Sequence, residues 1–410
     1  IGVKWFLPFY RNSGFVSAYS HLEKRFGTWA RIYASSSYLI IQLTRMAVIT
    51  YLMALPLNVL LGWNIQTVIL LTTIFTTIYA LMGGITAVIW ADALQTVILI
   101  LGALFCLGVM IAGMPGGTAQ LWEISQAHGK FSLGSFGWSL TEPTFWVMLL
   151  FGLTINLQNF GIDQNYIQRY HVSRSDKDAK LSLWFGGLMY IPLSAVFFFI
   201  GTALFAYYTA RPEDLSATYQ AAGKADSVFP YFIVTALPSG VTGLLIAAIF
   251  SAAMSTISTS LNSSATIILN DFYRRFAKSR GGEREEMLVL RLATLVWAIL
   301  ALLIAWAMST RMGSALDAAW ILAGIFNGGM LGLFLFGFLS SRTNISRGAV
   351  IGVMSGITVI FWTTISSRWA LWPEFLRSPF HDFLTVVLGT LTTLIVGMVA
   401  TLLIEKNFNK

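Results

Sequence analysis

The sequence predicts an all-α polytopic membrane protein, and three observations carry this prediction. Hydrophobic residues make up 56% of the 410 residues. Charged residues make up only 11%, against about 25% in an ordinary soluble protein. The apolar stretches are about 20 residues long, the length of a helix that crosses a bilayer, and they lack the short alternating segments of outer-membrane strands. A soluble enzyme and a disordered chain are both excluded, because so many apolar side chains cannot stay solvated.

Ten apolar stretches are long enough to cross a membrane as helices. In chain order they cover residues 35–60, 66–82, 87–113, 144–166, 182–209, 232–262, 287–308, 317–340, 348–366 and 383–404. Leu, Ile, Val, Phe, Ala and Gly dominate each of them, which favours helices. No long linker or break in composition divides the chain, so we expect residues 1–410 to form a single transmembrane domain.

The distribution of Lys and Arg predicts how the helices are oriented. If ten helices cross the membrane, nineteen of the 26 Lys and Arg residues fall on one side, six fall on the other, and Arg45 lies within a span. Cytoplasmic loops carry an excess of these residues, so the first side is expected to be cytoplasmic. The net charge of +8 follows from this bias. No loop combines a basic face with interleaved aromatic residues, so a nucleic-acid partner is not expected.

Two charged residues fall inside predicted spans, where such groups are costly and are functional candidates by default. Arg45 lies about ten residues into the first span, roughly 15 Å deep at 1.5 Å per residue. It either ties helices together, with its stem along apolar surface, or grips a ligand carboxylate with its planar fork. Asp92 lies a few residues into the third span. It either caps or pairs near the membrane interface, or holds a cation or a proton.

The sixth span carries a run of hydroxyl groups. Five hydroxyl side chains lie within six residues: Ser255, Thr256, Ser258, Thr259 and Ser260. Residues four apart, such as Ser255 and Thr259, lie on one helix face, and small residues spaced in this way also serve close helix packing. Hydroxyl, carbonyl and carboxylate oxygens are the ligands that a hard cation such as Na⁺ prefers. These hydroxyls and Asp92 fall at similar depths in their spans, which favours an ion site.

The fourth span contains a polar stretch with a glycine at 156–165. This composition indicates either a broken helix whose free backbone groups line a cavity, or the cytoplasmic end of the span. Motifs typical of enzymes are missing from the sequence. It has no nucleotide-binding lysine motif or dinucleotide fingerprint, and no histidine near the hydroxyl-rich span for nucleophilic chemistry. We therefore expect no enzymatic activity.

Several segments resemble the sodium:solute symporter family. Residues 79–95, with a double glycine and a Trp-x-Asp-x-x-Gln pattern, resemble the signature of that family. Residues 255–262 resemble its eighth core helix, and residues 164–169 resemble the end of its sixth. The resemblance extends over almost the whole chain. Within the family, residues 43–52 look most like the bacterial sialic acid symporters, in which an arginine at the place of Arg45 binds the substrate carboxylate.

The resemblance implies a LeuT-type inverted repeat of five plus five helices. The ten spans would then be core helices 3 to 10 and two C-terminal additions. A partial first repeat would occupy residues 1–113, the second repeat 144–340, and the extra helices 348–404. Core helix 1 and most of core helix 2 would be absent. Residues 1–10, which read as the tail of a hydrophobic segment, agree with this expectation.

The resemblance also implies binding sites. The principal sodium site would use the carbonyl of Ala252 and the hydroxyls of Ser255 and Thr256. A second sodium site would use Asp92, Ser255, Ser258 and Thr259. The substrate would contact Arg45, Asn156, Asn159, Phe160 and Asn327. Of these, Asn159 and Asn327 depart from the sialic acid pattern.

We therefore expect a symporter in the bacterial inner membrane that imports a small carboxylated solute together with one or two Na⁺ ions. Sialic acid is the favoured solute. Alternating access would move the solute. The alternative within the family is a symporter for a neutral sugar or a short monocarboxylate. The alternative from another class is a membrane sensor or a channel without coupled transport. Beyond the lipid bilayer and the anionic substrate, the sequence indicates no obligate protein partner.

Overall fold

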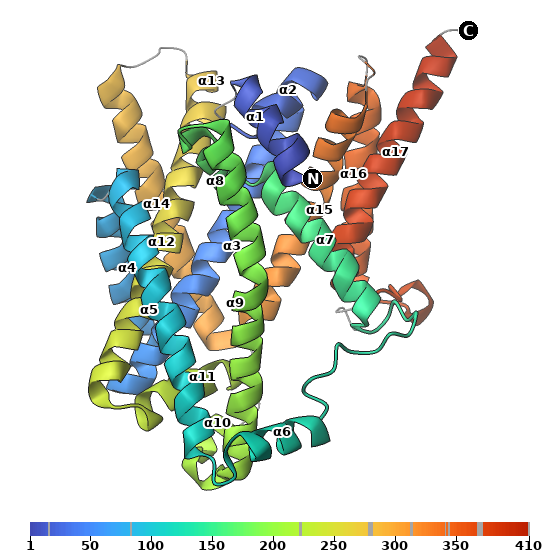
Figure 1. Ribbon diagram of the computed structural model, residues 1–410. Helices are drawn as coiled ribbons and strands as arrows, with labels where there is room; N and C mark the ends of the chain where they lie inside the picture. The colour runs from blue at the N-terminus through green and yellow to red at the C-terminus, as the bar shows by residue number, and fades with distance from the viewer. Residues whose placement is uncertain are drawn as a thin grey trace.

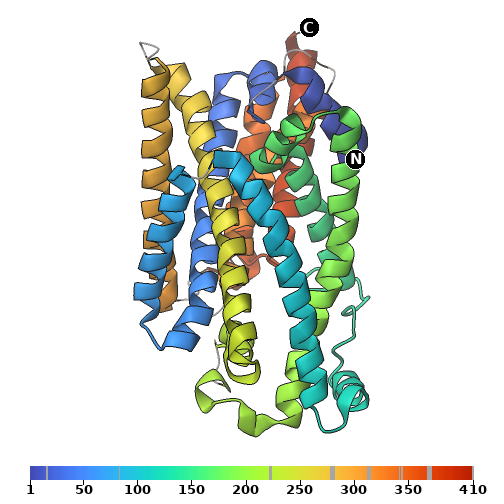
Figure 2. The same ribbon diagram turned by 60° about the vertical axis from the view of Figure 1, so that its left-hand side comes forward.

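Long helices that run along a common direction make up the computed structural model (Figure 1, Figure 2). The structure describes residues 1–14, 17–82, 84–220, 224–277, 282–311, 315–340, 342, 345–366 and 372–408. Within these ranges, the side chains of residues 82–94, 311–325 and 407–408 are outside the description. In the described residues every regular element is helical.

The long helices carry most of the chain. They are α3 (Thr28–Leu61), α4 (Ile65–Met82), α5 (Gly84–Gly113), α7 (Phe145–Ile162), α9 (Asp176–Ala210), α12 (Ser239–Ile267), α14 (Glu283–Arg311), α15 (Ala315–Leu339), α16 (Ser346–Ser366) and α17 (Leu384–Phe408). Shorter helices connect them. These are η1 (Gly2–Phe6), α1 (Leu7–Ser13), α2 (Ser20–Phe26), α6 (Gly117–Ala127), α8 (Gln164–Val172), η2 (Pro212–Asp214), α10 (Ala217–Gln220), α11 (Ala225–Ala236), η3 (Ile268–Tyr273), α13 (Arg274–Phe276) and η4 (Glu374–Leu376).

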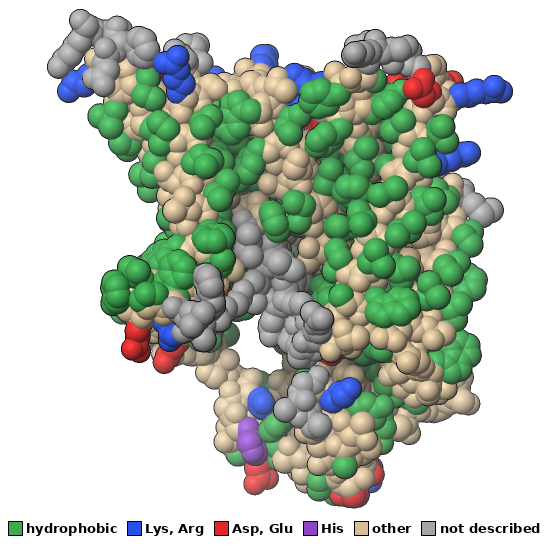
Figure 3. Space-filling model, turned by 180° about the vertical axis from the view of Figure 1, so that it is seen from behind, with side chains coloured by type: hydrophobic (Ala, Val, Ile, Leu, Met, Phe, Trp, Pro, Cys, Tyr) green, Lys and Arg blue, Asp and Glu red, His purple; other side chains and the backbone are tan. Residues whose placement is uncertain are grey.

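Eight helical stretches of the described residues are long and apolar enough to cross a membrane. They are Thr28–Leu61, Gln95–Gly113, Phe145–Ile162, Asp176–Ala210, Ser239–Phe276, Glu283–Thr310, Ser346–Ser366 and Leu384–Lys406. Two shorter apolar helices, Ile65–Leu81 and Phe326–Leu339, coincide with the predicted spans 66–82 and 317–340. Hydrophobic side chains cover the flank of the bundle, while Lys and Arg side chains gather at its two ends (Figure 3). The prediction of a helical, multi-pass membrane protein is confirmed.

One predicted boundary is wrong. The stretch 232–262 is two helices, because α11 ends at Ala236 and α12 begins at Ser239. Leu237 is extended, with φ −98° and ψ 152°. The ring of Pro238 explains this conformation, because a proline disfavours helical geometry in the residue before it.

The polar stretch of the fourth span does break the helix. Helix α7 ends at Ile162, and Asp163 is extended with φ −77° and ψ 120°. Its Oδ1 accepts a hydrogen bond of 2.8 Å from the backbone N–H of Asn165. Asp163 is therefore the N-cap of α8, a position for which aspartate is strongly preferred.

The short helices α1, α2, α8 and α13 lie at the same end of the bundle (Figure 1), and each of them carries Lys or Arg residues. We call this end cytoplasmic, following the distribution of these residues. Here four charged side chains from α2, α3, η3 and α13 form the cytoplasmic ionic cluster: Glu23, Arg31, Asp271 and Arg275. The cluster joins segments far apart in the sequence and holds α12 and α3 together at this end.

At the C-terminal side of the bundle, α16 packs closely against α17. A Cβ atom added to Gly352 would lie 2.5 Å from the backbone oxygen of Thr393. One added to Gly348 would lie 2.0 Å from Oγ1 of Thr401. Only glycine fits at these crossings, as is typical of helix pairs in membranes.

Candidate functional site

Arg45 lies in the middle of α3 and its exposed side chain opens into two cavities. It is seventeen residues from the start of the helix at Thr28, which is roughly 25 Å at 1.5 Å per residue. Within the described residues, it makes no ion pair. Because none of the described carboxylates forms an ion pair with it, this guanidinium can donate hydrogen bonds to the carboxylate of a ligand.

The larger cavity has a volume of about 750 Å³ and lies among α3, α7, α8, α9 and α15. The five residues predicted to contact the substrate all line it: Arg45, Asn156, Asn159, Phe160 and Asn327. All five side chains therefore border one space. What each of them binds remains a prediction.

Two amide side chains in the larger cavity have an oxygen atom without a hydrogen-bond partner among the described residues. Asn327 is 3% exposed and Gln158 is 4% exposed. The Oδ1 atom of the first and the Oε1 atom of the second have no partner in the described structure. Burying an unpaired polar atom is costly, so both oxygens are available to donor groups of a bound solute. Asn156 differs, because its Nδ2 donates a bond of 2.8 Å to the carbonyl of Gly152 in its own helix.

An aromatic wall closes one side of the larger cavity. The rings of Phe160 and Tyr166 meet edge to face with centroids 5.2 Å apart. The hydroxyl of Tyr170 donates a 2.9 Å bond to the carbonyl of Phe160. Asp163 lines the same cavity and is 6% exposed. The break between α7 and α8 therefore places aromatic side chains and a buried acid around one space.

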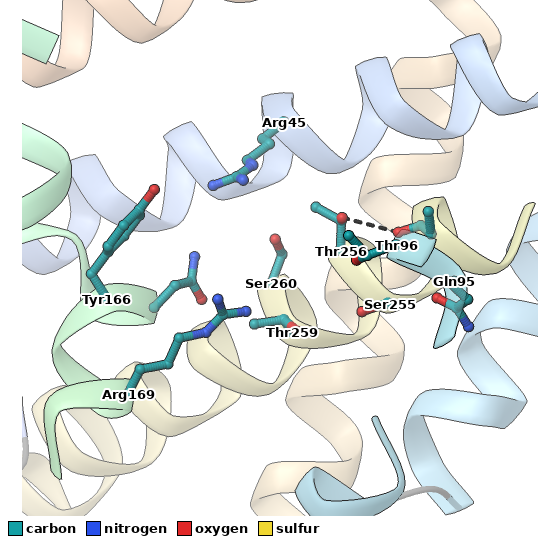
Figure 4. Close-up of a pocket in the computed structure, with 11 residues that line it drawn as sticks. Arg45, Gln95, Thr96, Tyr166, Arg169, Ser255, Thr256, Thr259 and Ser260 are labelled. Atoms are coloured by element: carbon teal, nitrogen blue, oxygen red, sulfur yellow. Dashed lines mark hydrogen bonds between the residues drawn. The ribbon is translucent and has the colours of Figure 1, made fainter. Parts of the chain in front are cut away.

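The smaller cavity has a volume of about 340 Å³ and lies among α3, α5, α8 and α12 (Figure 4). Four of the six residues predicted to bind sodium line it: Ala252, Ser255, Thr256 and Thr259. On the opposite wall, Gln95 and Thr96 of α5 add an amide and a hydroxyl group. The cavity therefore has the oxygen-rich lining that a hard cation prefers.

Hydrogen bonds around the smaller cavity orient its hydroxyl groups. Oγ1 of Thr256 donates a 3.0 Å bond to the carbonyl of Ala252, which leaves its lone pairs for a cation. The buried oxygens Oε1 of Gln95 and Oδ1 of Asn165 have no hydrogen-bond partner in the described structure. These unpaired oxygens in a hydroxyl-lined space fit a bound monovalent cation.

Of the two remaining predicted sodium ligands, Ser258 does not line the smaller cavity, and Asp92 has a side chain outside the described residues. Ser258 is completely buried, and its hydroxyl donates a 3.0 Å bond to the carbonyl of Ser255. The structure thus does not bring Ser258 into this space. Asp92 precedes Gln95 and Thr96 by three and four residues on α5, but its side chain lies outside the described residues.

Sequence reasoning missed several residues that line the cavities. They are Gln95, Thr96, Gln158, Asp163, Asn165, Tyr166, Arg169 and Ser260. A signal for Gln95 and Thr96 exists, because they follow Asp92 at helical spacing. Arg169 ends the segment that resembles the sixth core helix, and it lines both cavities.

Comparisons with known proteins agree with this architecture. A sequence model of the sodium:solute symporter family matches residues 1–356. The chain is 34% identical to the sodium/sialic acid symporter SiaT of Proteus mirabilis over 397 residues, which cover 96% of this chain and 77% of that protein. It is 32% identical to the sodium/sialic acid symporter NanT of Aliivibrio fischeri over 410 residues, which cover 99% of this chain and 78% of that protein.

A solved structure gives the same result for the fold. It is the substrate-bound outward-open state of a Na⁺-coupled sialic acid symporter, and it matches with a TM-score of 0.86 and 33% identity. The match covers 98% of this chain and 80% of the other. With the family model matching most of its residues and these relatives above 30% identity, the chain belongs to the sodium:solute symporter family.

Proposed function

We propose that the protein is a sodium-coupled symporter that imports sialic acid across the bacterial inner membrane by alternating access. One observation carries this proposal. Arg45 lines both an amide-lined cavity large enough for a solute and an oxygen-lined cavity suited to a cation. The names of two similar proteins, both sodium/sialic acid symporters, support the same substrate and the same ion.

The substrate would bind in the larger cavity. Arg45 would hold its carboxylate through two parallel N–H bonds, the geometry for which a guanidinium is suited. Asn159 and the unpaired amide oxygen of Asn327 would meet its hydroxyl and amide groups. Asn156 and Phe160 would form the polar and aromatic sides of the cavity. Arg45, which makes no ion pair among the described residues, favours an acidic solute over a neutral sugar.

Sodium would bind in the smaller cavity. The carbonyl of Ala252 and the hydroxyls of Ser255 and Thr256 would contribute to the principal site. A second ion would use Asp92 with Ser255 and Thr259, an assignment that rests on the spacing between Asp92 and the cavity residues Gln95 and Thr96. We leave Ser258 out of this assignment, because it lines neither cavity of the described structure.

The shared wall between the cavities offers a physical route for coupling. A cation bound beside the substrate carboxylate attracts it, and each ligand then raises the affinity of the protein for the other. Ligands move the protein between its outward-open and inward-open states only through their different affinities for those states. We infer a LeuT-type inverted repeat for this movement, with its first repeat within residues 1–113, its second within 144–340 and two further helices at 348–404. The helix break at Asp163 supports this inference, since broken helices are typical of such transporters.

The proposed reaction is movement of solute and ion without covalent chemistry, so no catalytic residue is assigned. An equilibrium binding experiment with the purified chain in detergent tests the proposal. Radiolabelled sialic acid should bind saturably in NaCl, and its binding should disappear when KCl replaces NaCl. Glucose and pyruvate, which represent a neutral sugar and a short monocarboxylate, should compete poorly. Binding that is equal in both salts, or equal competition by glucose, would contradict the proposal.

A further inference from the structure

A second arginine shares both cavities with Arg45. Arg169 belongs to α8, on the far side of the helix break at Asp163, and lines the 340 Å³ and the 750 Å³ spaces. In the described structure, the guanidinium of Arg169 makes no ion pair. Its side chain reaches from α8 towards Thr259 and Ser260 of α12 (Figure 4). An arginine that makes no ion pair among the described residues and is directed into a cavity is suited to bind an anion.

The smaller cavity has two chemically different ends (Figure 4). Gln95, Thr96 and Thr256 surround one end with oxygen atoms, while Arg45 and Arg169 lie towards the other. Charges of like sign repel one another, so a cation favours the end away from the arginines. The end that holds the two guanidinium groups favours an anion.

A buried amide side chain supports an anion at the arginine end. Asn165 is 8% exposed, lines the smaller cavity, and its Oδ1 has no partner in the described structure. Its amide group can donate to an acidic ligand through Nδ2 while Oδ1 accepts from a solute hydroxyl. Ser260, on the opposite wall, contributes a further hydroxyl group to the same cavity.

Arg169 lies nearer the cytoplasmic end than Arg45 does. The residues that follow it are tied to that end, because Nη1 of Arg11 donates to the carbonyls of Tyr170 at 2.6 Å and Ser173 at 3.1 Å. The lining of the larger cavity continues past Arg169 to Ser173 and Ala179. A solute moving from Arg45 towards the cytoplasm along this cavity therefore passes Arg169.

We propose that Arg169 and Asn165 form a second carboxylate subsite, which receives the acidic group of the substrate after it leaves Arg45 on the way to the cytoplasm. This inference rests on the proposed function, because it names a further step for the same anionic solute. Two guanidinium groups in succession keep the carboxylate paired along the route. The free energy of a charged group that loses its partner inside the membrane is high, so a relay of this kind lowers the barrier to release.

Side-specific measurements test the subsite. Right-side-out and inverted membrane vesicles expose the outer and the cytoplasmic face of the protein, and the half-saturating concentration of sialic acid is measured at each face. Arg169→Gln should raise this concentration about tenfold at the cytoplasmic face, as expected for the loss of a charge-assisted bond, and less than twofold at the outer face. Arg169→Lys, which keeps the charge and loses the fork, should give an intermediate shift at the cytoplasmic face. Arg174→Gln is the matched control, because Arg174 is an exposed arginine in the following loop that lines neither cavity, and it should shift neither value.

Two further arms identify what occupies the subsite. The methyl ester of sialic acid, which lacks the negative charge, should compete equally well in the Arg169→Gln variant and in the wild type. Replacing chloride by gluconate should leave the shift caused by Arg169→Gln in place. A shift that vanishes without chloride would show that the subsite holds a free anion, and would overturn the proposal. Equal shifts at both faces, no shift at either, or an equal shift for the ester would also overturn it.

The same experiment separates this proposal from the function on which it rests. If wild-type vesicles show no sodium-dependent uptake of sialic acid at either face, the proposed function fails and the subsite fails with it. If uptake is present and Arg45→Gln abolishes it while Arg169→Gln has no side-specific effect, only the subsite is overturned.

Discussion

The Nη2 atom of Arg31 lies 2.5 Å from Oδ1 of Asp271, and the Asp271 side chain is completely buried. The other carboxylate oxygen, Oδ2, accepts bonds from the hydroxyls of Ser35 at 2.5 Å and Ser17 at 2.9 Å. Both oxygens of a buried acid are thereby satisfied by groups from the N-terminal third of the chain. This pairing fixes the cytoplasmic end of the α12 segment, and hence the hydroxyl-bearing helix, against α3, which carries Arg45.

We predict that Asp271→Ala destabilises the protein strongly. The substitution leaves the guanidinium of Arg31 without its closest partner, and breaking a buried pair in this way costs about 3–5 kcal/mol. The midpoint of thermal unfolding in detergent should fall markedly. Glu286→Gln is the control, because its partner Arg274 is 46% exposed, and an exposed pair contributes about 0–1 kcal/mol. Equal midpoints for the two variants would argue against the role of the cytoplasmic ionic cluster.

We predict that stability falls as the pH is lowered towards 4 because of His21. Burial, together with the positive charges of Arg25 and Lys24, lowers the pKa of His21 from 6.5 to about 4. Between these values the unfolded state binds more protons than the folded state, so stability rises with pH through this window and is lost as the pH falls. The unfolding midpoint of the wild type should therefore drop between pH 6.5 and 4.

The variant His21→Gln checks the source of this dependence. Its unfolding midpoint should vary less with pH over the same window than that of the wild type. Substituting the exposed His128 in the same way should preserve the wild-type profile. A profile that His21→Gln leaves unchanged would assign the pH dependence to other groups.

We predict that Ser255→Ala and Thr256→Ala weaken sodium binding. Each removes an oxygen from the lining of the smaller cavity, and a lost bond to a charged partner is worth about 1.5–3 kcal/mol. The sodium concentration for half-maximal uptake should rise about tenfold or more. Ser264→Ala is the control on the same helix, since Ser264 is buried and lines neither cavity. The assignment fails if all three variants keep the wild-type sodium dependence.

We predict that Arg45→Lys reduces substrate binding almost as much as Arg45→Ala. Lysine keeps the charge but cannot make the two parallel bonds by which a guanidinium holds a carboxylate. Binding of sialic acid should weaken by about tenfold or more in both variants, while sodium-dependent stabilisation of the empty protein persists. The measurement is radioligand binding alongside a thermal shift in NaCl. If the lysine variant bound sialic acid with wild-type affinity, the positive charge alone would be sufficient and the two parallel bonds of the guanidinium would not be needed.

Much of the fold could be predicted from sequence alone, because a bilayer imposes a simple rule on length and composition. Eight of the ten apolar stretches fall on single helices, 232–262 falls on α11 and α12, and 144–166 contains the helix break at Asp163. The boundary at 237–238 was missed because the stretch 232–262 is apolar on average both before and after Pro238. Average hydropathy cannot register a change of direction that depends on the backbone conformation of a single residue.

The site was predictable where a costly residue marks it. Arg45 could be identified because a charged side chain inside a membrane span is energetically costly and therefore marks a functional site. Asn159 and Asn327 line the larger cavity together with it. Ser258 is completely buried and does not line the smaller cavity, because spacing along a helix does not show how deeply neighbouring helices cover each hydroxyl. The place of Arg169 in the cavity walls could not be predicted, because it depends on the helix break at Asp163.

The central claim is that a sodium gradient drives uptake of a carboxylated solute through this protein. The most direct measurement is accumulation of radiolabelled sialic acid in proteoliposomes that contain the chain. An inward sodium gradient should drive accumulation above the external concentration, and uptake should collapse when the gradient is removed or when Arg45→Ala is used. Uptake of the same rate and extent with and without the gradient would contradict the account.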